Sequence, residues 1–326
     1  MTFTDLVVLS PVYDDWAAVA LLLPRLDQEL ARSGACARVV LVNDGSINPP
    51  PGDLVRVPLT AISAVHVLSL RRNLGHQRAI AVGLAFIQER MPCDAVVLMD
   101  ADGEDDPLDV PRLLANVREG QGKSVVFARR MRRSEGVAFT VLYRTYRWVH
   151  RLMTGIPVQV GNFSIVPYPL LGRLVVMSDL WNHNAAAVLQ SRIPYDMVPT
   201  SRAQRLSGTS RMNFVALVAH GMSAVAVFAD RVGVRLLIAS IVALGATLGM
   251  LAVMAISWIW TGHPPSGRLL TAIAVGLVLF VQIVATASLF VLQVLFARGT
   301  STFIPVRDYP FFVASDEAIW RSSVTA

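Results

Sequence analysis

The first half of the chain alternates between short apolar runs and amphipathic stretches. Five runs are each short enough to form one buried strand. They span residues 5–10, 38–42, 65–70, 95–99 and 124–128. Three stretches between them repeat apolar side chains at the spacing of a helix. They span residues 16–30, 76–90 and 108–119. The alternation predicts an α/β fold with a parallel-centred sheet and helices on both faces.

Two much longer apolar segments lie further along the chain. Residues 236–260 and 269–296 contain no charged side chain, and each exceeds the roughly 20 residues needed to cross a bilayer core. A polar turn at residues 261–268 separates them. The pattern predicts a transmembrane hairpin, and a pair of buried helices in a water-soluble protein is the alternative.

Charged residues around these segments predict an orientation. Arg231 and Arg235 precede the first segment, Arg298 and Arg307 follow the second, and Arg268 alone lies in the turn. Because cytoplasmic loops are enriched in Lys and Arg, both flanks are expected on the cytoplasmic side. The N-terminus lacks the basic region of a signal peptide. We therefore expect a multi-pass protein of the cell inner membrane, with the N-terminal domain and both termini in the cytoplasm.

An apolar stretch at residues 214–228 precedes the first long segment and is interrupted by His220 and Gly221. The pattern is typical of a helix that lies along the membrane surface, and a simple connecting helix fits it nearly as well. The predicted organisation is a cytoplasmic domain over residues 1–212, an interfacial or juxtamembrane helix over 213–232, two transmembrane helices within 233–298 and a cytoplasmic tail over 299–326.

Composition narrows the range of partners. The chain has 326 residues, of which 54% are hydrophobic and 16% charged, and its formal net charge is +6. The positive charge suits an anionic membrane surface or phosphate-bearing ligands. Nucleic acid is not expected as a partner, because no basic and aromatic binding motif occurs. Cys36 and Cys93 lack the spacing of a metal site.

One predicted strand, at residues 95–99, ends abruptly in carboxylates. Asp100 and Asp102 follow it directly. Ligands of open α/β sheets bind beyond the carboxyl ends of the strands, so a cation and a phosphate-bearing ligand are expected beside these side chains. Two carboxylates one residue apart can share one Mg2+ or Mn2+. An acidic loop that caps the next helix, with Pro107 in the first turn, is the alternative.

Polar clusters follow three other predicted strands. Carboxylates in residues 10–14 and 43–46 could accept hydrogen bonds from a nucleotide base and ribose, although turn chemistry explains each cluster alone equally well. Residues 71–77 place cations and a glycine turn at a helix N-terminus, a natural corner for phosphate. Together with Asp100 and Asp102, these clusters converge on one edge of the sheet.

Four motifs in this order resemble those of family 2 glycosyltransferases. They read Val42-Asn43-Asp44-Gly45-Ser46, Arg72-Asn73-Leu74-Gly75-His76, Asp100-Ala101-Asp102 and Arg205-Leu206-Ser207-Gly208-Thr209-Ser210-Arg211. Within the family, the chain is similar to polyprenyl-phosphate glycosyltransferases, typified by dolichol-phosphate mannose synthase. The resemblance covers residues 5–211, and the apolar hairpin that follows is also similar to that of bacterial members.

The resemblance implies a GT-A fold, a UDP- or GDP-linked sugar as donor, and Mg2+ or Mn2+ bridging the donor diphosphate. The catalytic residues would be Asp100, Asp102 and Arg205, and the metal ligands Asp102 and Glu104. Donor and nucleotide binding would fall to Pro11, Tyr13, Asp14, Asp44, Asn73, Gly75, Asp100 and Asp102. The acceptor phosphate would face Arg129, Arg130, Arg133, Arg202 and Ser210.

The resemblance also implies a membrane-anchored, metal-dependent hexosyltransferase of the cell envelope. A polyprenyl phosphate on the cytoplasmic side would attack the sugar in a single displacement with inversion. This acceptor is anionic at neutral pH, so it needs alignment and charge stabilisation rather than a strong base. Two alternatives stay open: transfer to another lipid or a polysaccharide, and a non-catalytic membrane subunit that binds sugar nucleotide. A homo-oligomer is a further expectation, because relatives often self-associate.

The sequence departs from the family pattern in two places. Asn162 and Ser164 lie in a segment where many relatives carry Gly-Asp-Phe-Arg or Ser-Gly-Phe-Arg. Asn162 cannot act as a base and Ser164 removes a cation, so the departures leave the sugar and the acceptor open. His183 lies in the second unusual segment, residues 179–184, and is expected to be structural rather than to contact substrate.

Overall fold

The computed structural model describes residues 3–130, 148–156, 160–208, 214–264, 266–298 and 303–322. The chain divides into two compact units. One comprises residues 1–144, 158–227 and 303–326, and the other comprises 145–157 and 228–302. The chain therefore passes from the first unit to the second and back twice.

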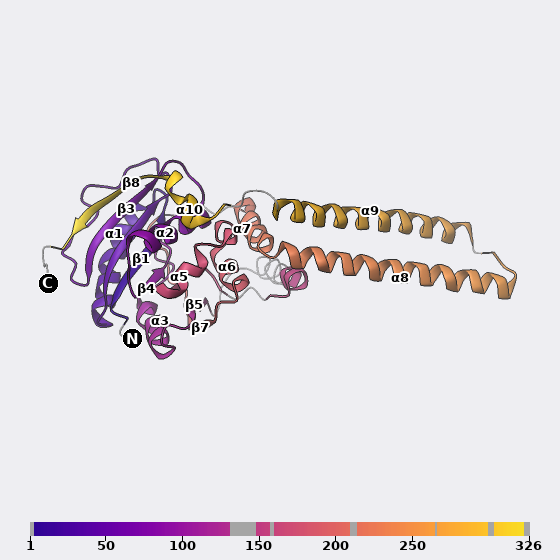
Figure 1. Cartoon of the computed structure of the whole chain (residues 1–326), viewed down its shortest axis with the longest axis horizontal. Helices are drawn as coiled ribbons and strands as arrows, with labels where there is room; N and C mark the ends of the chain where they lie inside the picture. Colours follow the sequence, from indigo (N-terminus) through magenta and orange to yellow (C-terminus); the bar gives the residue numbers. More distant parts are fainter. Residues whose placement is uncertain are drawn as a thin grey trace. The chain divides into compact units, whose positions relative to one another are not determined.

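An eight-stranded sheet forms the centre of the first unit in the described part of the chain (Figure 1). Its strands are β1 (Asp5–Val12), β2 (Cys36–Asn43), β3 (Ile62–Leu70), β4 (Ala95–Leu98), β5 (Val125–Arg130), β6 (Ser164–Pro167), β7 (Tyr195–Thr200) and β8 (Val313–Arg321). They lie in the order β7-β5-β6-β4-β1-β2-β3-β8. The strands β4, β1, β2 and β3 pair in parallel, whereas β6 and β8 are antiparallel to β4 and β3. The predicted parallel centre is confirmed.

Helices cover both faces of this sheet. Leu6 and Val8 of β1 share one core with α1 (Trp16–Arg32) and α3 (Val110–Glu119), whereas Val7 and Leu9 share the other with α2 (His76–Arg90). Because side chains alternate between the faces of a strand, the unbroken apolar run of β1 supplies both cores. The result is the GT-A-like mixed α/β fold that the sequence predicted.

Further helices complete the first unit. They are η1 (Pro107–Asp109), α5 (Tyr168–Leu174), η2 (Ser178–Trp181), α6 (Asn184–Gln190), α7 (Phe214–Ala226), α10 (Pro305–Asp308) and η3 (Tyr309–Phe311). The α7 helix lies within the stretch where the sequence predicted an interfacial helix.

The C-terminal segment is part of the sheet and not only a tail. Strand β8 pairs with β3 at the edge of the sheet (Figure 1). Before it, Tyr309 packs edge-on against Phe86 of α2, with ring centroids 6.4 Å apart. The Tyr309 hydroxyl donates to Glu89 Oε2 at 3.0 Å. Contacts to α2 therefore fix the segment that follows the apolar hairpin.

Tyr309→Ala is expected to lower the free energy of unfolding by about 3 kcal/mol, because it removes a buried aromatic ring and opens a cavity. Tyr309 is only 4% exposed. Phe311→Ala, two residues away, is the control, since the Phe311 ring is 76% exposed. Thermal unfolding of both variants in the same detergent tests the expectation. Equal melting temperatures would mean that the C-terminal segment does not stabilise the sheet.

The second unit contains two long helices, α8 (Ala229–Thr261) and α9 (Gly267–Arg298). Both are long and apolar enough to cross a membrane, and they fit the predicted transmembrane hairpin. Helix α8 begins before the predicted start at residue 236, because Arg235 in its second turn is accommodated without a break. The Arg235 guanidinium donates to the carbonyl oxygens of Arg151 and Leu152 at 3.2 and 2.6 Å.

Candidate active site

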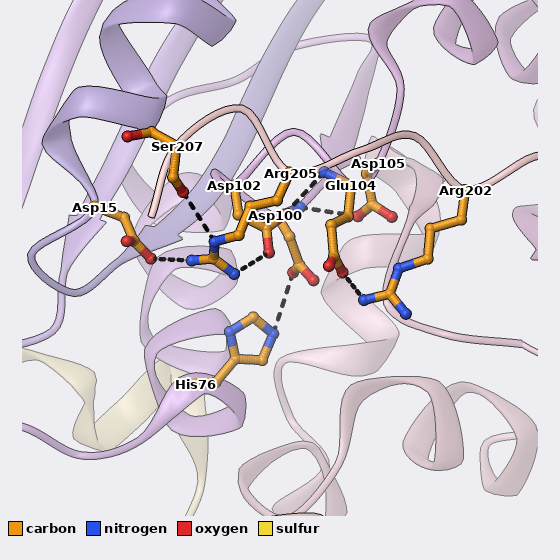
Figure 2. A network of polar contacts seen from close by, with 9 residues as sticks. All are labelled: Asp15, His76, Asp100, Asp102, Glu104, Asp105, Arg202, Arg205 and Ser207. Carbon is orange, nitrogen blue, oxygen red and sulfur yellow. Dashed lines mark hydrogen bonds and ion pairs between the residues drawn. The ribbon is translucent and has the colours of Figure 1, made fainter. Parts of the chain in front are cut away.

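The carboxylates that the sequence singled out lie in the loop that follows β4, at its carboxyl end. Their arrangement is set within the loop itself (Figure 2). The Asp100 amide donates to Asp105 Oδ2 at 2.9 Å, and the Glu104 amide donates to Asp102 Oδ1 at 2.9 Å. Gly103 takes a φ of +81°, which a residue with a side chain rarely adopts. The loop is thereby turned so that Asp100, Asp102 and Glu104 gather in one place.

These acidic side chains carry like charges that need a cation. Burial raises the pKa of Asp102, and the neighbouring carboxylate of Asp100 raises it further. Both effects disfavour the charged form of Asp102. A positive charge beside the loop, from an arginine or a metal ion, therefore stabilises the ionised form of Asp102.

A loop at residues 201–208 supplies two such cations. Arg205 donates to Asp102 Oδ2 at 2.9 Å and to Asp15 Oδ2 at 2.8 Å, and Arg202 forms an ion pair with Glu104 (Figure 2). Main-chain hydrogen bonds join the same two loops: Ala203 N donates to Glu104 O, and Leu206 N donates to Asp102 O. The arginine loop is thus fastened to the acidic loop by both backbone and side chains.

The N-terminus of α2 forms a third side of the site, beside the acidic loop and the arginine loop. Both carboxylate oxygens of Asp44 accept main-chain hydrogen bonds, from Leu74 N at 2.7 Å and Gly75 N at 2.9 Å. This turn starts α2 at His76, whose Nε2 lies 3.3 Å from Asp100 Oδ1. Burial lowers the pKa of His76, but the carboxylates of Asp100, Asp105 and Asp102 together outweigh this effect, and the net shift is upward.

Asn162, at the first departure from the family pattern, joins this side of the site. Its Nδ2 lies 3.0 Å from His76 Nε2, and its Oδ1 accepts from Gln77 Nε2 at 3.2 Å. Gln77 Oε1 in turn accepts from the backbone amide of Asn184 at 2.8 Å. A line of polar contacts therefore runs from Asp100 through His76 and Asn162 towards α6.

The family model for glycosyl transferase family 2 matches residues 8–173, slightly more than half of the chain. The chain belongs to this family. The site just described lies largely within the matched segment, and the arginine loop follows it.

Curated relatives of this glycosyltransferase match over part of their length. An undecaprenyl-phosphate 4-deoxy-4-formamido-L-arabinose transferase of Pseudomonas aeruginosa is 34% identical over 150 residues, covering 46% of this chain and 40% of that protein. An uncharacterized glycosyltransferase of Bacillus subtilis, YkcC, is 27% identical over 49% of this chain and 48% of its own. The chain thus spans less than half the length of these relatives.

Solved structures with a similar fold include glucosyl-3-phosphoglycerate synthase from Mycobacterium tuberculosis, in complex with Mn2+, UDP-glucose and phosphoglyceric acid. It has a TM-score of 0.49 and 18% sequence identity, and the alignment covers 71% of this glycosyltransferase and 80% of that chain.

The predicted donor residues lie at or just after the carboxyl ends of the parallel strands. Pro11 is in β1, Tyr13 and Asp14 follow it, Asp44 follows β2, and Asn73 and Gly75 precede α2. Asp14 has a φ of +52° and accepts from Asn48 N at 3.0 Å, and Asp44 is 4% exposed. Both carboxylates therefore also shape the loops in which they lie. Their contact with a nucleoside stays a prediction.

The predicted acceptor residues are described only in part. Arg202 lies in the arginine loop, and Arg129 lies near the end of β5. Only the backbone of Arg130 is described, while Arg133 and Ser210 lie outside the described residues. The acceptor role of this group stays a prediction.

Two residues of the site were absent from the predicted set. Asp15 pairs with Arg205, although the sequence pointed to its neighbour Asp14. His76 appeared only as the last residue of a motif. Two adjacent aspartates, Asp14 and Asp15, follow β1. Because the turn holds Asp14, its neighbour can face the site, and this pair could have pointed to Asp15. His183 caps α6 by accepting from Ala186 N, which agrees with the structural role expected for it.

The carboxylate oxygens of the acidic loop are the type of ligand that a hard divalent cation prefers. Among the described residues, no three His, Cys, Asp or Glu side chains form a ready-made metal cage. Mg2+, however, is commonly held by only one or two carboxylates, with substrate phosphates completing its coordination. Asp102 and Glu104 are the two carboxylates predicted to play this part, and Arg205 and Arg202 are now paired with them. Their role as metal ligands stays a prediction.

Proposed function

We propose that the protein is a membrane-anchored inverting glycosyltransferase that moves a sugar from a UDP- or GDP-linked donor to a polyprenyl phosphate. Family membership supports sugar transfer, and the relative named as an undecaprenyl-phosphate transferase supports the acceptor class. The two long apolar helices support an anchor in the membrane where such an acceptor resides. We further propose that the reaction uses Mg2+ or Mn2+.

The acidic loop facing two arginines is the observation that carries this proposal. Asp102 and Glu104 would hold the metal ion, which when bound neutralises the donor diphosphate as it leaves. Asp100 would help to orient the donor, and His76 would hold Asp100 through its 3.3 Å contact. Arg205 and Arg202 would turn from the carboxylates towards the phosphates, for which guanidinium groups provide a matching fork of donors.

A lipid-phosphate acceptor requires no strong base from the protein. A lipid phosphate is already charged at neutral pH, so the attacking oxygen needs no strong base. Asn162, which cannot remove a proton, is compatible with this chemistry. Direct attack on the anomeric carbon would invert its configuration, and an α-linked donor would give a β-linked lipid-phosphate sugar. The contribution of the site is then alignment of the two substrates and stabilisation of their charge.

The C-terminal strand supports an orientation for the anchor. Helices α8 and α9 lie between β7 and β8 in the chain, and both strands belong to the same sheet. If each helix crosses the bilayer once, the chain leaves and re-enters on the side that carries the sheet. We propose that this side is the cytoplasmic face of the inner membrane, because the arginine-rich flanks of the hairpin favour it.

Transfer by the full-length protein tests the proposal. Protein in proteoliposomes that contain undecaprenyl phosphate would be supplied with a panel of UDP- and GDP-sugars and Mn2+. At least one donor is expected to give a lipid-linked sugar that chelation by EDTA abolishes, with β configuration by NMR. Vesicles with undecaprenol, which lacks the phosphate, are the control. Donor binding without transfer from any sugar in the panel would instead favour the non-catalytic alternative.

A further inference from the structure

Three aromatic rings gather where the C-terminal segment rejoins the first unit. Trp181 of η2 lies against Phe303, with ring centroids 4.0 Å apart, and against Phe312, with centroids 5.1 Å apart. The Phe303 and Phe312 rings lie 5.7 Å from each other. All three side chains are half-buried, and the two phenylalanines flank α10 and η3 in the segment between α9 and β8. The chain that returns from the apolar hairpin therefore packs against Trp181.

The same indole ring connects this segment to α2. The guanidinium carbon of Arg78 lies 5.3 Å from the centroid of the Trp181 ring, within the range of a cation–π interaction. Arg78 is the third residue of α2, and its side chain is exposed to solvent. Phe312 adds a main-chain contact, because its carbonyl oxygen accepts from Arg71 N at 2.9 Å in the loop that leads to α2. The C-terminal segment is thus connected to the start of α2 through a side chain and through the backbone.

The start of α2 depends on contacts from outside the helix. The first backbone N–H groups of an α-helix have no partner within it, and a capping side chain usually helps to hold them. Gly75 occupies the capping position here and has no side chain. The turn that follows carries His76, whose Nε2 lies 3.3 Å from Asp100 Oδ1 (Figure 2), and Gln77, whose Oε1 accepts from Asn184 N at 2.8 Å. Contacts made by its side chains therefore decide where this turn lies, and with it His76.

We propose that Trp181 is a positioning residue of the donor site. It holds the first turn of α2 through Arg78, and the position of this turn sets the distance between His76 and Asp100. The inference rests on the proposed function, in which Asp100 helps to orient the donor. The C-terminal segment thereby contributes to donor binding indirectly, because its two aromatic rings keep the indole in place. A tryptophan that only filled space in the fold would affect stability and not the affinity for the donor.

The kinetics of transfer separate positioning from a purely structural role. In proteoliposomes, Arg78→Ala and Trp181→Ala are each expected to raise the KM for the donor by about twofold to fivefold, the range for one exposed cation–π contact, with kcat little changed. Trp181→Phe keeps an aromatic ring for Arg78 and should recover most of the donor affinity. Arg173→Ala is the control, because it removes an exposed arginine from α5 and should leave both constants unchanged. A lower kcat with an unchanged KM would indicate only a loss of folded enzyme and would overturn the proposal.

A double variant and hydrogen exchange test the route through α2. If Trp181 acts through Arg78, the KM of the double alanine variant should equal that of Trp181→Ala alone, whereas independent effects would multiply and overturn the proposal. In the full-length protein, backbone amides at residues 76–80 should exchange with deuterium faster in either single alanine variant than in Arg173→Ala. Unchanged exchange would overturn the proposal whether or not sugar is transferred. Faster exchange in a protein that transfers no sugar from any donor would refute the proposed function but support the link between Trp181 and α2.

Discussion

Asp102→Asn is expected to lower the rate of sugar transfer by about 100- to 1,000-fold, the usual range when one preorganised electrostatic contact is lost. The substitution removes the charge that would hold the divalent ion but keeps the size of the side chain. It also keeps the oxygen that accepts from the Glu104 amide at 2.9 Å, so the loop should retain its shape. The transfer assay in proteoliposomes gives the rate, and thermal unfolding shows whether folding is intact.

Asp106→Asn is the matched control for this variant. Asp106 lies in the same loop, but its carboxylate accepts from Leu108 N at 3.1 Å and caps the helix that follows. Asparagine caps helices about as well as aspartate, so both transfer and stability should be preserved. A fully active Asp102→Asn enzyme, or turnover that survives EDTA, would refute the assignment of this loop to a metal ion.

The central part of the fold could be predicted from the sequence because burial leaves a strong pattern there. Strands β1 to β5 are apolar runs, and the helices among them have clear periodicity. Strands β6 and β8, which the sequence did not predict, lie where the apolar pattern is weak. Strand β6 has only four residues and ends at Pro167, while β8 carries Asp316, Glu317 and Arg321. An edge strand has a neighbour on one side only, so water can solvate its charged side chains and no apolar run is needed.

In the site, too, some residues can be recognised from their neighbours in the sequence, whereas others are brought together from distant parts of the chain. The carboxylates after β4 are a local signal, because the strand and the acidic residues adjoin in the sequence. The contact between Arg205 and Asp15 joins positions 190 residues apart, and nothing near either residue reveals it. The contact depends on a loop crossing the ends of two strands. Spacing within a motif does not encode such a crossing, although the order of the motifs did single out Arg205 as a candidate site residue.

The guanidinium group of Arg205 supplies a positive charge within the site. Its side chain and that of Asp102 are each 16% exposed, so their ion pair is well shielded from solvent. One arginine thereby stabilises Asp102 and Asp15 at once. A divalent ion that binds Asp102 must displace this guanidinium or share the carboxylate with it. Metal binding and the position of the arginine loop are therefore expected to be coupled.

Arg205→Ala is accordingly expected to have opposite effects on metal binding and on turnover. Without the competing guanidinium, Asp102 should bind Mn2+ about tenfold more tightly in the absence of donor, since a hydrogen bond to a charged group contributes about 1.5 kcal/mol or more. Transfer should nevertheless slow by about 100-fold, because the leaving diphosphate loses a cation. Titration calorimetry with Mn2+ alone measures the first effect, and the proteoliposome assay measures the second.

The control for Arg205→Ala is Arg112→Ala, which breaks an ion pair with Asp109 outside the site. Both Mn2+ affinity and transfer should remain as in the unaltered protein. Arg205→Lys adds a further comparison, because it keeps the positive charge but loses the planar fork that spans Asp102 and Asp15. Its transfer rate should lie between those of Arg205→Ala and the unaltered protein. If Arg205→Ala instead weakened Mn2+ binding, the arginine would be supporting the metal site, and the proposed competition for Asp102 would be wrong.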